Sequence, residues 1–276
     1  MANKIKILKI TFFIAVSISI LLVGVYFILK KDTESKKVID YPEKIKIMQF
    51  DINHGLNPNK ELNLKQVEEL INKEKPHIVC LNNVDNGTQQ TGYINQAKKL
   101  GQDLDMKYSY GKRYEKESGS TGNVILTTLP IKFAQNIFFK TGKGRQNSLL
   151  YIIQNYRGIE FHIFNLQFDE KYAREQYREA KRIVSEKDIK SGHLVITGNF
   201  AMKKTSNEIK EFSNMYTNIF DTSESQFTYS IPNPDKQYDY IFVGNNVKVL
   251  KSKVINNEMT QRISYHLPVV TTLKLK

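Results

Sequence analysis

Short apolar runs alternate with charged segments from residue 43 to the end of the chain. KIKIMQF (44–50) and HIVCLN (77–82) have the β-branched and aromatic composition of strands. Residues 63–75, between them, predict an amphipathic helix whose apolar face consists of Leu64, Val67, Leu70 and Ile71. This order predicts a βαβ unit at the start of a folded domain.

The rest of the chain continues the strand-rich pattern. Strand-like segments are 123–128, 148–154, 159–166, 193–198, 238–243, 247–255 and 267–275. The turn NYRG (155–158) predicts a hairpin over 148–166, and residues 170–190 predict a long amphipathic helix. Residues 111–122 carry mixed charge and predict a flexible surface loop. Strands interspersed with helices predict an α/β sandwich of sheets covered by helices.

An uncharged apolar run occupies residues 10–29, with lysines on both sides. As a helix it would span about 30 Å, the hydrocarbon thickness of a bilayer. We therefore expect a tail (1–9), a transmembrane anchor (10–29), a linker (30–42) and a globular domain (43–276). A cleaved signal peptide is the alternative, although no small-residue cleavage site ends the run. The flanking lysines do not set the orientation, and we expect a single-pass protein of the cell membrane with its domain outside the cytoplasm.

Composition supports a folded domain and points weakly to anionic partners. Of the 276 residues, 40% are hydrophobic, which suits a sizeable core and excludes a disordered chain. Lysine and arginine exceed aspartate and glutamate by 41 to 28, which favours phospholipid headgroups, wall polyanions or nucleic acid as neighbours. The basic residues are spread along the chain, however, so nucleic-acid binding has no support beyond the net charge.

Cysteine and histidine usage limits the chemistry further. Cys80 is the single cysteine, which excludes an intramolecular disulfide and a thiolate metal site. The five histidines show no zinc-ligand spacing.

Polar residues gather at the ends of the predicted strands, where a sheet presents catalytic groups. The seven motifs are QFDINHG (49–55), LNNVD (81–85), TGNVIL (121–126), FNLQFD (164–169), TGNFAM (197–202), YDYIFV (238–243) and SYHLPVV (264–270). In this order the motifs resemble the endonuclease/exonuclease/phosphatase family, across residues 45–274. The resemblance implies a DNase I-like, four-layer α/β sandwich of two mixed sheets flanked by helices. It also implies metal-assisted hydrolysis of a phosphoester, with Mg²⁺ on the phosphate and a histidine held by an aspartate.

The chain departs from the family pattern at most of the implied catalytic positions. Asn83 replaces the metal-binding glutamate, and Asn199 and Ala201 replace the aspartate and asparagine of the GDFN motif. Gln167 stands for a histidine and Tyr265 for an aspartate. The positions retained from the pattern are Asp239, His266 and Asn123, with His54 and Arg145 as weaker candidates and Asp85 as a marker of the substrate-side loop.

Asp51 takes the position of a family asparagine and is the remaining candidate acid for a metal. Together with Asn83 it makes up the implied metal position, which we expect to be degenerate because Mg²⁺ is held through carboxylates. A weak site rearranged around Asp51 is the alternative. The His266–Asp239 pair has two interpretations, a retained dyad and a structural hydrogen bond.

Two functional hypotheses follow. The first is a membrane-anchored member of the family that has lost hydrolysis, needs no cofactor, and binds a protein or an anionic partner. The second is an active phosphodiesterase or phosphatase that uses Mg²⁺ or Mn²⁺ on a lipid, nucleic-acid or wall-polymer substrate. A plain nucleic-acid-binding module ranks third.

Overall fold

The computed structural model describes residues 17–25, 41–141, 145–187, 189–220 and 226–276. The chain divides into two units, Met1–Tyr41 and Pro42–Lys276. In the first unit, residues 17–25 form a helix with exposed side chains. No helix among the described residues is long and apolar enough to cross a membrane. The predicted tail, nearly all of the predicted linker and both ends of the predicted anchor (10–16 and 26–29) lie outside the described residues, so the anchor stays a prediction.

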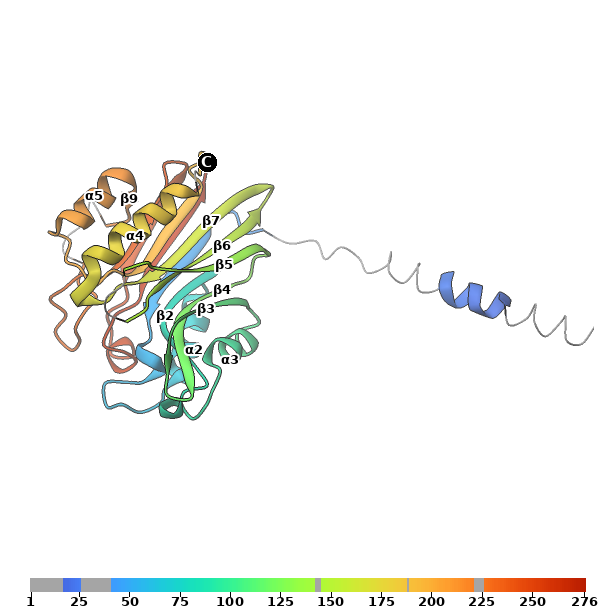
Figure 1. The fold of residues 1–276 in the computed structure, drawn as a ribbon, viewed down its shortest axis with the longest axis horizontal. Helices are drawn as coiled ribbons and strands as arrows, with labels where there is room; N and C mark the ends of the chain where they lie inside the picture. Colours follow the sequence, from blue (N-terminus) through green and yellow to red (C-terminus); the bar gives the residue numbers. More distant parts are fainter. Residues whose placement is uncertain (1–16, 26–40, 142–144, 188, 221–225) are drawn as a thin grey trace, which may run out of the picture. The chain divides into compact units, whose positions relative to one another are not determined.

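Two six-stranded sheets form the framework of the second unit (Figure 1). Sheet 1 has the order β11 (Val247–Val254), β12 (Val269–Leu275), β1 (Ile45–Asp51), β2 (Ile78–Asn86), β4 (Gly119–Thr127) and β3 (Lys107–Lys116). Sheet 2 has the order β5 (Ile131–Phe138), β6 (Ser148–Tyr156), β7 (Ile159–Gln167), β8 (Leu194–Asn199), β10 (Asp239–Val243) and β9 (Thr217–Asn218). Each sheet is mixed, because β1 pairs with β2 and β7 with β8 in parallel while the flanking pairs are antiparallel.

Helices cover the outer faces of both sheets. The apolar stripe of α2 (Leu64–Glu74) and the buried residues of α3 (Gln96–Asp103) join one hydrophobic core with sheet 1. On the other side, α4 (Ala173–Glu186) and α5 (Asn207–Met215) join a second core with sheet 2. Short 3-10 turns lie in the connections: η1 (Asn53–Gly55), η2 (Gln89–Thr91), η3 (Glu170–Tyr172) and η4 (Thr260–Arg262). The predicted sandwich of two mixed sheets flanked by helices is confirmed.

The two predictions for local connections have opposite outcomes. The hairpin over 148–166 is confirmed: Arg157 and Gly158 have φ of +52° and +87°, as a two-residue type I′ turn requires. The surface loop predicted over 111–122 is wrong, because β3 and β4 pair across a tight turn there. Sheet pairing outweighs the charged composition of this segment.

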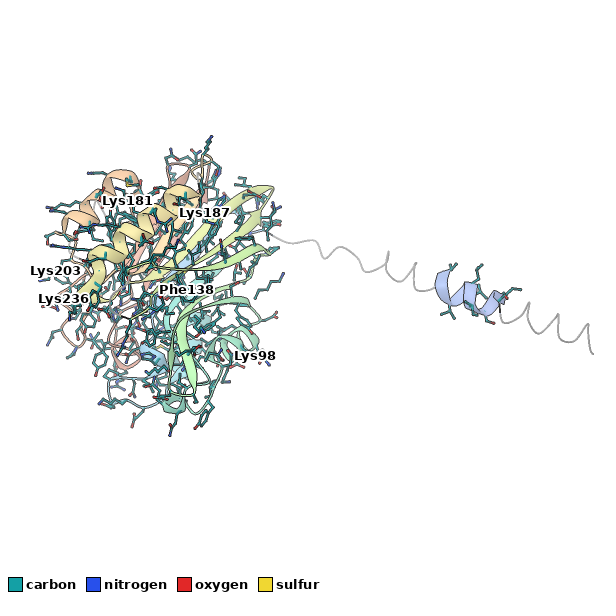
Figure 2. All side chains as sticks on the ribbon, viewed as in Figure 1. Lys98, Phe138, Lys181, Lys187, Lys203 and Lys236 are labelled. Atoms are coloured by element: carbon teal, nitrogen blue, oxygen red, sulfur yellow. The ribbon has the colours of Figure 1, made fainter. Side chains whose placement is uncertain are left out.

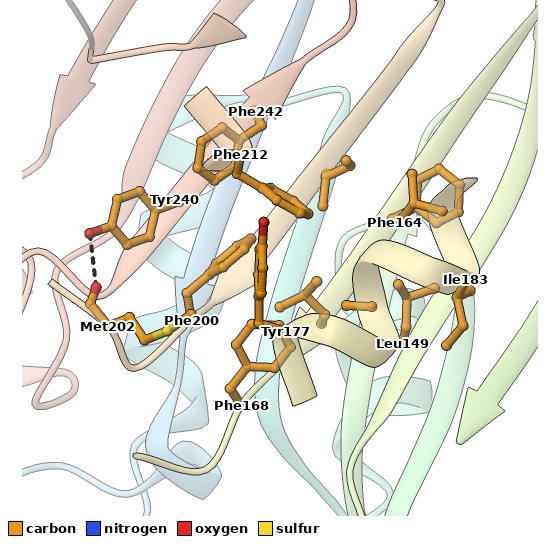
Figure 3. Packing of buried hydrophobic residues seen from close by; sticks show 14 of the residues in the cluster. Leu149, Phe164, Phe168, Tyr177, Ile183, Phe200, Met202, Phe212, Tyr240 and Phe242 are labelled. Carbon is orange, nitrogen blue, oxygen red and sulfur yellow. Dashed lines mark hydrogen bonds between the residues drawn. The ribbon is translucent and has the colours of Figure 1, made fainter. Parts of the chain in front are cut away.

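Aromatic side chains in the core between sheet 2 and its helices pack around Phe200, the residue that follows β8 (Figure 3). The ring of Phe200 makes edge-to-face contacts with Phe212, Tyr240 and Phe242, at centroid distances of 5.8, 5.4 and 5.4 Å. The Tyr240 hydroxyl donates to the Met202 carbonyl at 2.9 Å. These contacts hold the turn that follows Asn199.

Lysines are distributed over several elements of this unit. Figure 2 labels Lys98 on α3, Lys181 on α4, Lys187 directly after α4, and Lys203 and Lys236 in connecting segments. The positive charge is spread in space as it is along the sequence, so net charge alone does not define a binding surface.

We predict that Gly198→Ala destabilises the protein by about 3 kcal/mol or more. Gly198 has φ of +144°, and an added Cβ would lie 1.8 Å from the Leu166 carbonyl oxygen. Urea unfolding followed by circular dichroism measures the loss.

Gly92→Ala is the matched control. Gly92 has φ of +67°, but an added Cβ would meet nothing within 4 Å, so only the backbone cost of about 1–2 kcal/mol is expected. Equal losses in the two variants would contradict the close approach of β8 to β7.

Candidate functional site

The candidate site lies where the inward faces of the central strands change from apolar to polar. Side chains alternate along a strand, and on β1 Met48 and Phe50 join the outer core. The inward face of β1 therefore carries Ile47, then Gln49, then Asp51, all buried. The inward faces of three other strands carry buried amides: Asn82 in the middle of β2, and Gln167 and Asn199 as the last residues of β7 and β8.

The Asn82 amide links the two sheets beneath the site. Its oxygen accepts from Gln49 Nε2 at 2.6 Å and from the Asn199 backbone N–H at 3.1 Å. Its nitrogen donates to the side-chain oxygens of Asn123 and Asn165, at 2.8 and 3.0 Å. Because Asn165 and Asn199 belong to sheet 2, one fully buried side chain fixes the spacing of both sheets here.

Two β-bulges deliver further side chains to the site. The register of β2 against β4 shifts between Leu81 and Val84, and that of β3 against β4 shifts between Lys112 and Tyr114. The first bulge contains Asn83, which has φ of +52°, a strained conformation typical of functional sites. The second bulge contains Arg113 and turns it into the buried region, where 5% of its surface stays exposed.

The carboxylate of Asp51 is the centre of the site. It is 1% exposed and accepts from Asn83 Nδ2 at 2.9 Å, Asn199 Nδ2 at 2.9 Å and the Asn53 backbone N–H at 3.0 Å. Burial opposes the charged form, but the positive charge of His266 and these hydrogen bonds outweigh it and lower the pKa of Asp51. Asp51 is therefore an ionised carboxylate surrounded by N–H donors.

His266 lies between two carboxylates. Its Nδ1 is 2.7 Å from Asp239 Oδ2 and its Nε2 is 3.7 Å from Asp51 Oδ2. Burial alone would lower the pKa of His266, but Asp239 and Asp51 raise it to about 9. The ring of Tyr229 covers the imidazole at a centroid distance of 4.6 Å. At neutral pH His266 is thus an imidazolium ion and not a free base.

Arg113 supplies a second buried cation. Its Nε donates to Asn147 Oδ1 at 2.7 Å, and its Nη1 donates to Asn83 Oδ1 at 2.8 Å and to Gln167 Oε1. Burial lowers the pKa of Arg113, and the nearby Asp51 opposes that shift. The charges of Asp51 and Asp239 are matched by those of His266 and Arg113.

The amides turn their NH₂ groups, and not their oxygens, toward Asp51. The Asn83 oxygen accepts from Arg113, and the Asn199 oxygen accepts from the Ala201 backbone N–H at 2.9 Å. Neither neighbour can accept a hydrogen bond, so neither amide can reverse without losing its partner. Mg²⁺ and Mn²⁺ need oxygen ligands with at least one free carboxylate. In the part of the chain that the structure describes, no three His, Cys, Asp or Glu side chains are grouped to hold a metal, and the residues around Asp51 do not fit one.

The structure brings most of the sequence-predicted residues together. The contacts described above join six of them: Asp51, Asn83, Gln167, Asn199, Asp239 and His266. Gln167 Nε2 lies 3.5 Å from Asp51 Oδ2. Asn123 lies in the layer beneath, where it bonds Asn82 and the Ser148 carbonyl.

The other candidates have partners of their own. The Tyr265 hydroxyl donates to the Pro58 carbonyl at 3.2 Å. His54 Nδ1 lies 2.6 Å from Asp85 Oδ1, and Asp85 also accepts from Thr88 and Gln90. Arg145 is exposed and bonds the hydroxyl of Tyr114.

Sequence reasoning missed Arg113, because it lies in the segment interpreted as a loop. The available signal was the period-two spacing of Tyr108 and Tyr110, which is typical of a strand. The direction of Arg113 follows from the bulge after Lys112, and no pattern in one sequence indicates a bulge.

We predict that the protein loses stability as the pH rises from about 6.5 to 9. The folded pKa of His266, about 9, exceeds the model-peptide value of 6.5, so protonation stabilises the folded state. This contribution is complete below pH 6.5 and is lost through pH 9, on the order of 3 kcal/mol. Urea unfolding at half-unit pH steps measures it.

Asp239→Asn is the matched variant, because it removes the nearest anion of His266 and keeps the side-chain shape. Its loss of stability over the same pH range should be at most half as large. An unchanged pH profile in Asp239→Asn would contradict the assignment to His266.

Comparison with known proteins agrees with this architecture. A sequence model of the Endonuclease/Exonuclease/phosphatase family matches residues 48–266. No functionally curated protein matches the sequence.

Solved structures share the fold at low sequence identity. An endonuclease/exonuclease/phosphatase from Beutenbergia cavernae has a TM-score of 0.69 at 17% identity, covering 85% of this chain and 72% of its own. Mannosyl-6-phosphatase from Bacteroides thetaiotaomicron has 0.68 at 14% identity, covering 83% and 99%. The human Nocturnin catalytic domain, with bound sulfate, has 0.68 at 15% identity, covering 85% and 94%. The matched sequence pattern spans most of the sandwich, and the chain belongs to the endonuclease/exonuclease/phosphatase family.

Proposed function

We propose that this protein is a membrane-anchored family member that has lost metal-dependent phosphoester hydrolysis and acts as a binding or scaffolding domain. The observation that carries the proposal is the environment of Asp51. Among the residues that the structure describes, it is the one acid that bonds Asn83 and Asn199, and N–H donors occupy both oxygens of its carboxylate. A divalent cation there would have to displace these donors and approach His266 and Arg113.

Electrostatics supports this proposal. Two buried cations already neutralise Asp51 and Asp239, so a bound Mg²⁺ would leave two uncompensated positive charges in a region of low dielectric. A histidine held as an imidazolium also cannot accept a proton from water. A metal-assisted hydrolase needs a free carboxylate for the metal and a base for the attacking water, and these buried ion pairs oppose both.

The second candidate is an active phosphodiesterase or phosphatase with a rearranged site that uses Mg²⁺ or Mn²⁺. One observation favours it: the His266–Asp239 pair and Asp51 form a continuous chain of ionisable groups. Among the similar structures, one is named a mannosyl-6-phosphatase. The substrate under this candidate would be a phosphoester of lipid, nucleic acid or wall polymer.

Hydrolysis and metal binding separate the two candidates. We expect the full chain, purified in mild detergent, to show no heat of Mn²⁺ binding in calorimetry. We also expect no Mn²⁺-dependent release of nitrophenolate from bis(p-nitrophenyl) phosphate above the level of Asp51→Asn.

Asp103→Asn is the control for the loss of a carboxylate, because Asp103 lies on α3 and pairs with Lys99 at the surface. Turnover that requires Mn²⁺, survives in Asp103→Asn and disappears in Asp51→Asn would overturn the proposal and establish the second candidate.

The membrane anchor is a separate part of the proposal and rests on the apolar run at 10–29. We expect the full chain to stay with the membrane fraction after alkaline carbonate extraction, and deletion of residues 1–40 to release it. Protease added to intact cells without their walls should digest the domain if it faces outward. Release of the full chain by carbonate would refute the anchor.

A further inference from the structure

The strand ends around the point where the chain enters the domain form one end of the sandwich. Ile45 at the start of β1 pairs near the end of β12, and Ile78 at the start of β2 pairs with the last residue of β4. The Tyr156 hydroxyl at the end of β6 donates to the carbonyls of Pro42 and Glu43. This entry end consists of residues 42–46, 72–78, 103–107, 127–132, 155–160, 189–194, 244–248 and 273–276.

The candidate site lies at the opposite end of the same strands. Asp51, Gln167 and Asn199 are the last residues of β1, β7 and β8, which begin at the entry end. The strand β7 has nine residues, so about 25 Å of strand separates the two ends. A surface that binds the entry end therefore does not reach Asp51.

Lysines occur throughout the domain, but acidic residues are unevenly distributed between its two ends. At the entry end, basic residues outnumber acidic ones. The described acidic residues are as numerous as the basic ones in the connections at the site end, which are 51–62, 83–90, 112–118, 138–147, 168–175, 200–208, 232–239 and 255–266. The excess of positive charge therefore lies away from the site.

Most acids of the entry end are already paired. Glu43, Glu74 and Glu160 form ion pairs with lysines, and so does Asp103. Asp105 alone has no such partner among the described residues. The exposed lysines of the entry end that form no ion pair with a described residue are Lys44, Lys73, Lys75, Lys107, Lys248 and Lys276.

These unpaired lysines are spread over an area. They come from the segment before β1, the end of α2, the starts of β3 and β11, and the end of the chain after β12. Each carries a hydrated point charge on a flexible stem, so it attracts an anion without a fixed hydrogen-bond geometry. An array of anionic headgroups matches this distribution better than one small anion does.

The length of chain before Pro42 favours a membrane as this array. Residues 30–41 separate the predicted anchor from Pro42, and such a segment spans at most about 40 Å when fully extended. A domain tethered by so short a segment stays near the membrane surface. Its point of attachment is the end that carries the unpaired lysines.

We propose that the entry end binds the anionic headgroups of phospholipids. The inference builds on the proposed function, in which the predicted anchor brings the domain to a membrane. It names a lipid surface as an anionic partner of the protein, and it leaves the candidate site open to the aqueous phase. A partner of the site therefore approaches from solution, because the headgroups that bind the entry end do not reach it.

Vesicle flotation of the domain without residues 1–40 tests this surface apart from the anchor. The shortened chain keeps both sheets and both hydrophobic cores, which lie within Pro42–Lys276. We expect it to bind vesicles made of equal parts of phosphatidylcholine and phosphatidylglycerol, and to dissociate as salt is added. We expect no binding to vesicles of phosphatidylcholine alone. Binding to neither kind of vesicle, or equal binding to both, would overturn the inference.

Replacing three lysines of the entry end measures their contribution. The combined variant carries Lys75→Gln, Lys107→Gln and Lys248→Gln. Each lysine near an anionic surface is expected to contribute about fivefold in affinity, so the combined loss should be about a hundredfold.

The matched control removes the same charge from the site end. It carries Lys60→Gln, Lys171→Gln and Lys203→Gln, all at exposed positions, and should bind vesicles as the unaltered domain does. Equal losses in the two triple variants would mean attraction by net charge alone and would overturn the assignment to the entry end.

The full chain in the same mixed vesicles gives a second measurement. Cys80 is buried, so a dye attaches to a cysteine introduced at the surface. Energy transfer to dye-labelled headgroups should be stronger from Thr128→Cys, at the entry end, than from Asn59→Cys, at the site end. Equal or reversed transfer would overturn the inference, even where the triple variant fails to fold.

The outcomes also separate this inference from the proposed function. Release of the full chain by carbonate, with vesicle binding that still depends on the lysines of the entry end, contradicts the anchor and leaves the lipid surface in place. Retention after carbonate extraction, with equal losses in the two triple variants, contradicts this inference alone.

Discussion

The ionised carboxylate of Asp51, buried between two β-sheets, is the constraint on which the site depends. A buried charge is costly unless hydrogen bonds and an opposite charge compensate it. Here amide groups from β2 and β8, a backbone N–H and an imidazolium ion provide that compensation. Each donor comes from a different segment, so compensation of this charge requires the sandwich to be assembled.

Arg113 extends this constraint outward. Its guanidinium binds the oxygens of the Asn83 and Gln167 amides, whose NH₂ groups then face Asp51. Cation, amide dipole and anion thus follow one another in the order that electrostatics favours. The family resemblance implies a glutamate at position 83. Its carboxylate would place a negative charge next to Asp51, where the amide of Asn83 now presents its NH₂ group. The amide at position 83 and the acid at position 51 are therefore matched to each other.

Much of the fold could be predicted from the sequence, since the strands show the expected composition and the hairpin turn its residues. The helix α3 was not predicted, because its apolar face consists of Ala97 and Leu100 alone, too few for a period to emerge. The strand β3 is not evident from the sequence, because its charged residues obscure the alternation of its tyrosines. Helix α5 is equally hard to predict, because its buried face consists of Ile209 and Phe212.

The residues of the candidate site were identified through ordered strand-end motifs, and the structure places Asp51, Asn83 and Asn199 in contact. What the motifs could not provide is the direction of side chains at bulges, which depends on pairing between strands distant in sequence. Arg113 is the clearest case. The same limitation applies to amide orientation, which is decided by neighbours such as the Ala201 N–H.

The Asn82 amide has a consequence for the kinetics of opening. Its nitrogen and oxygen bond groups of β1, β4, β7 and β8, so the sheets cannot separate locally here without breaking its bonds to both Asn165 and Asn199. Amide hydrogens near Asn82 should then exchange with solvent deuterium only when the whole sandwich unfolds. The buried layer around Asn82 should therefore be the last part of the domain to open. The site above this layer has a rigid base.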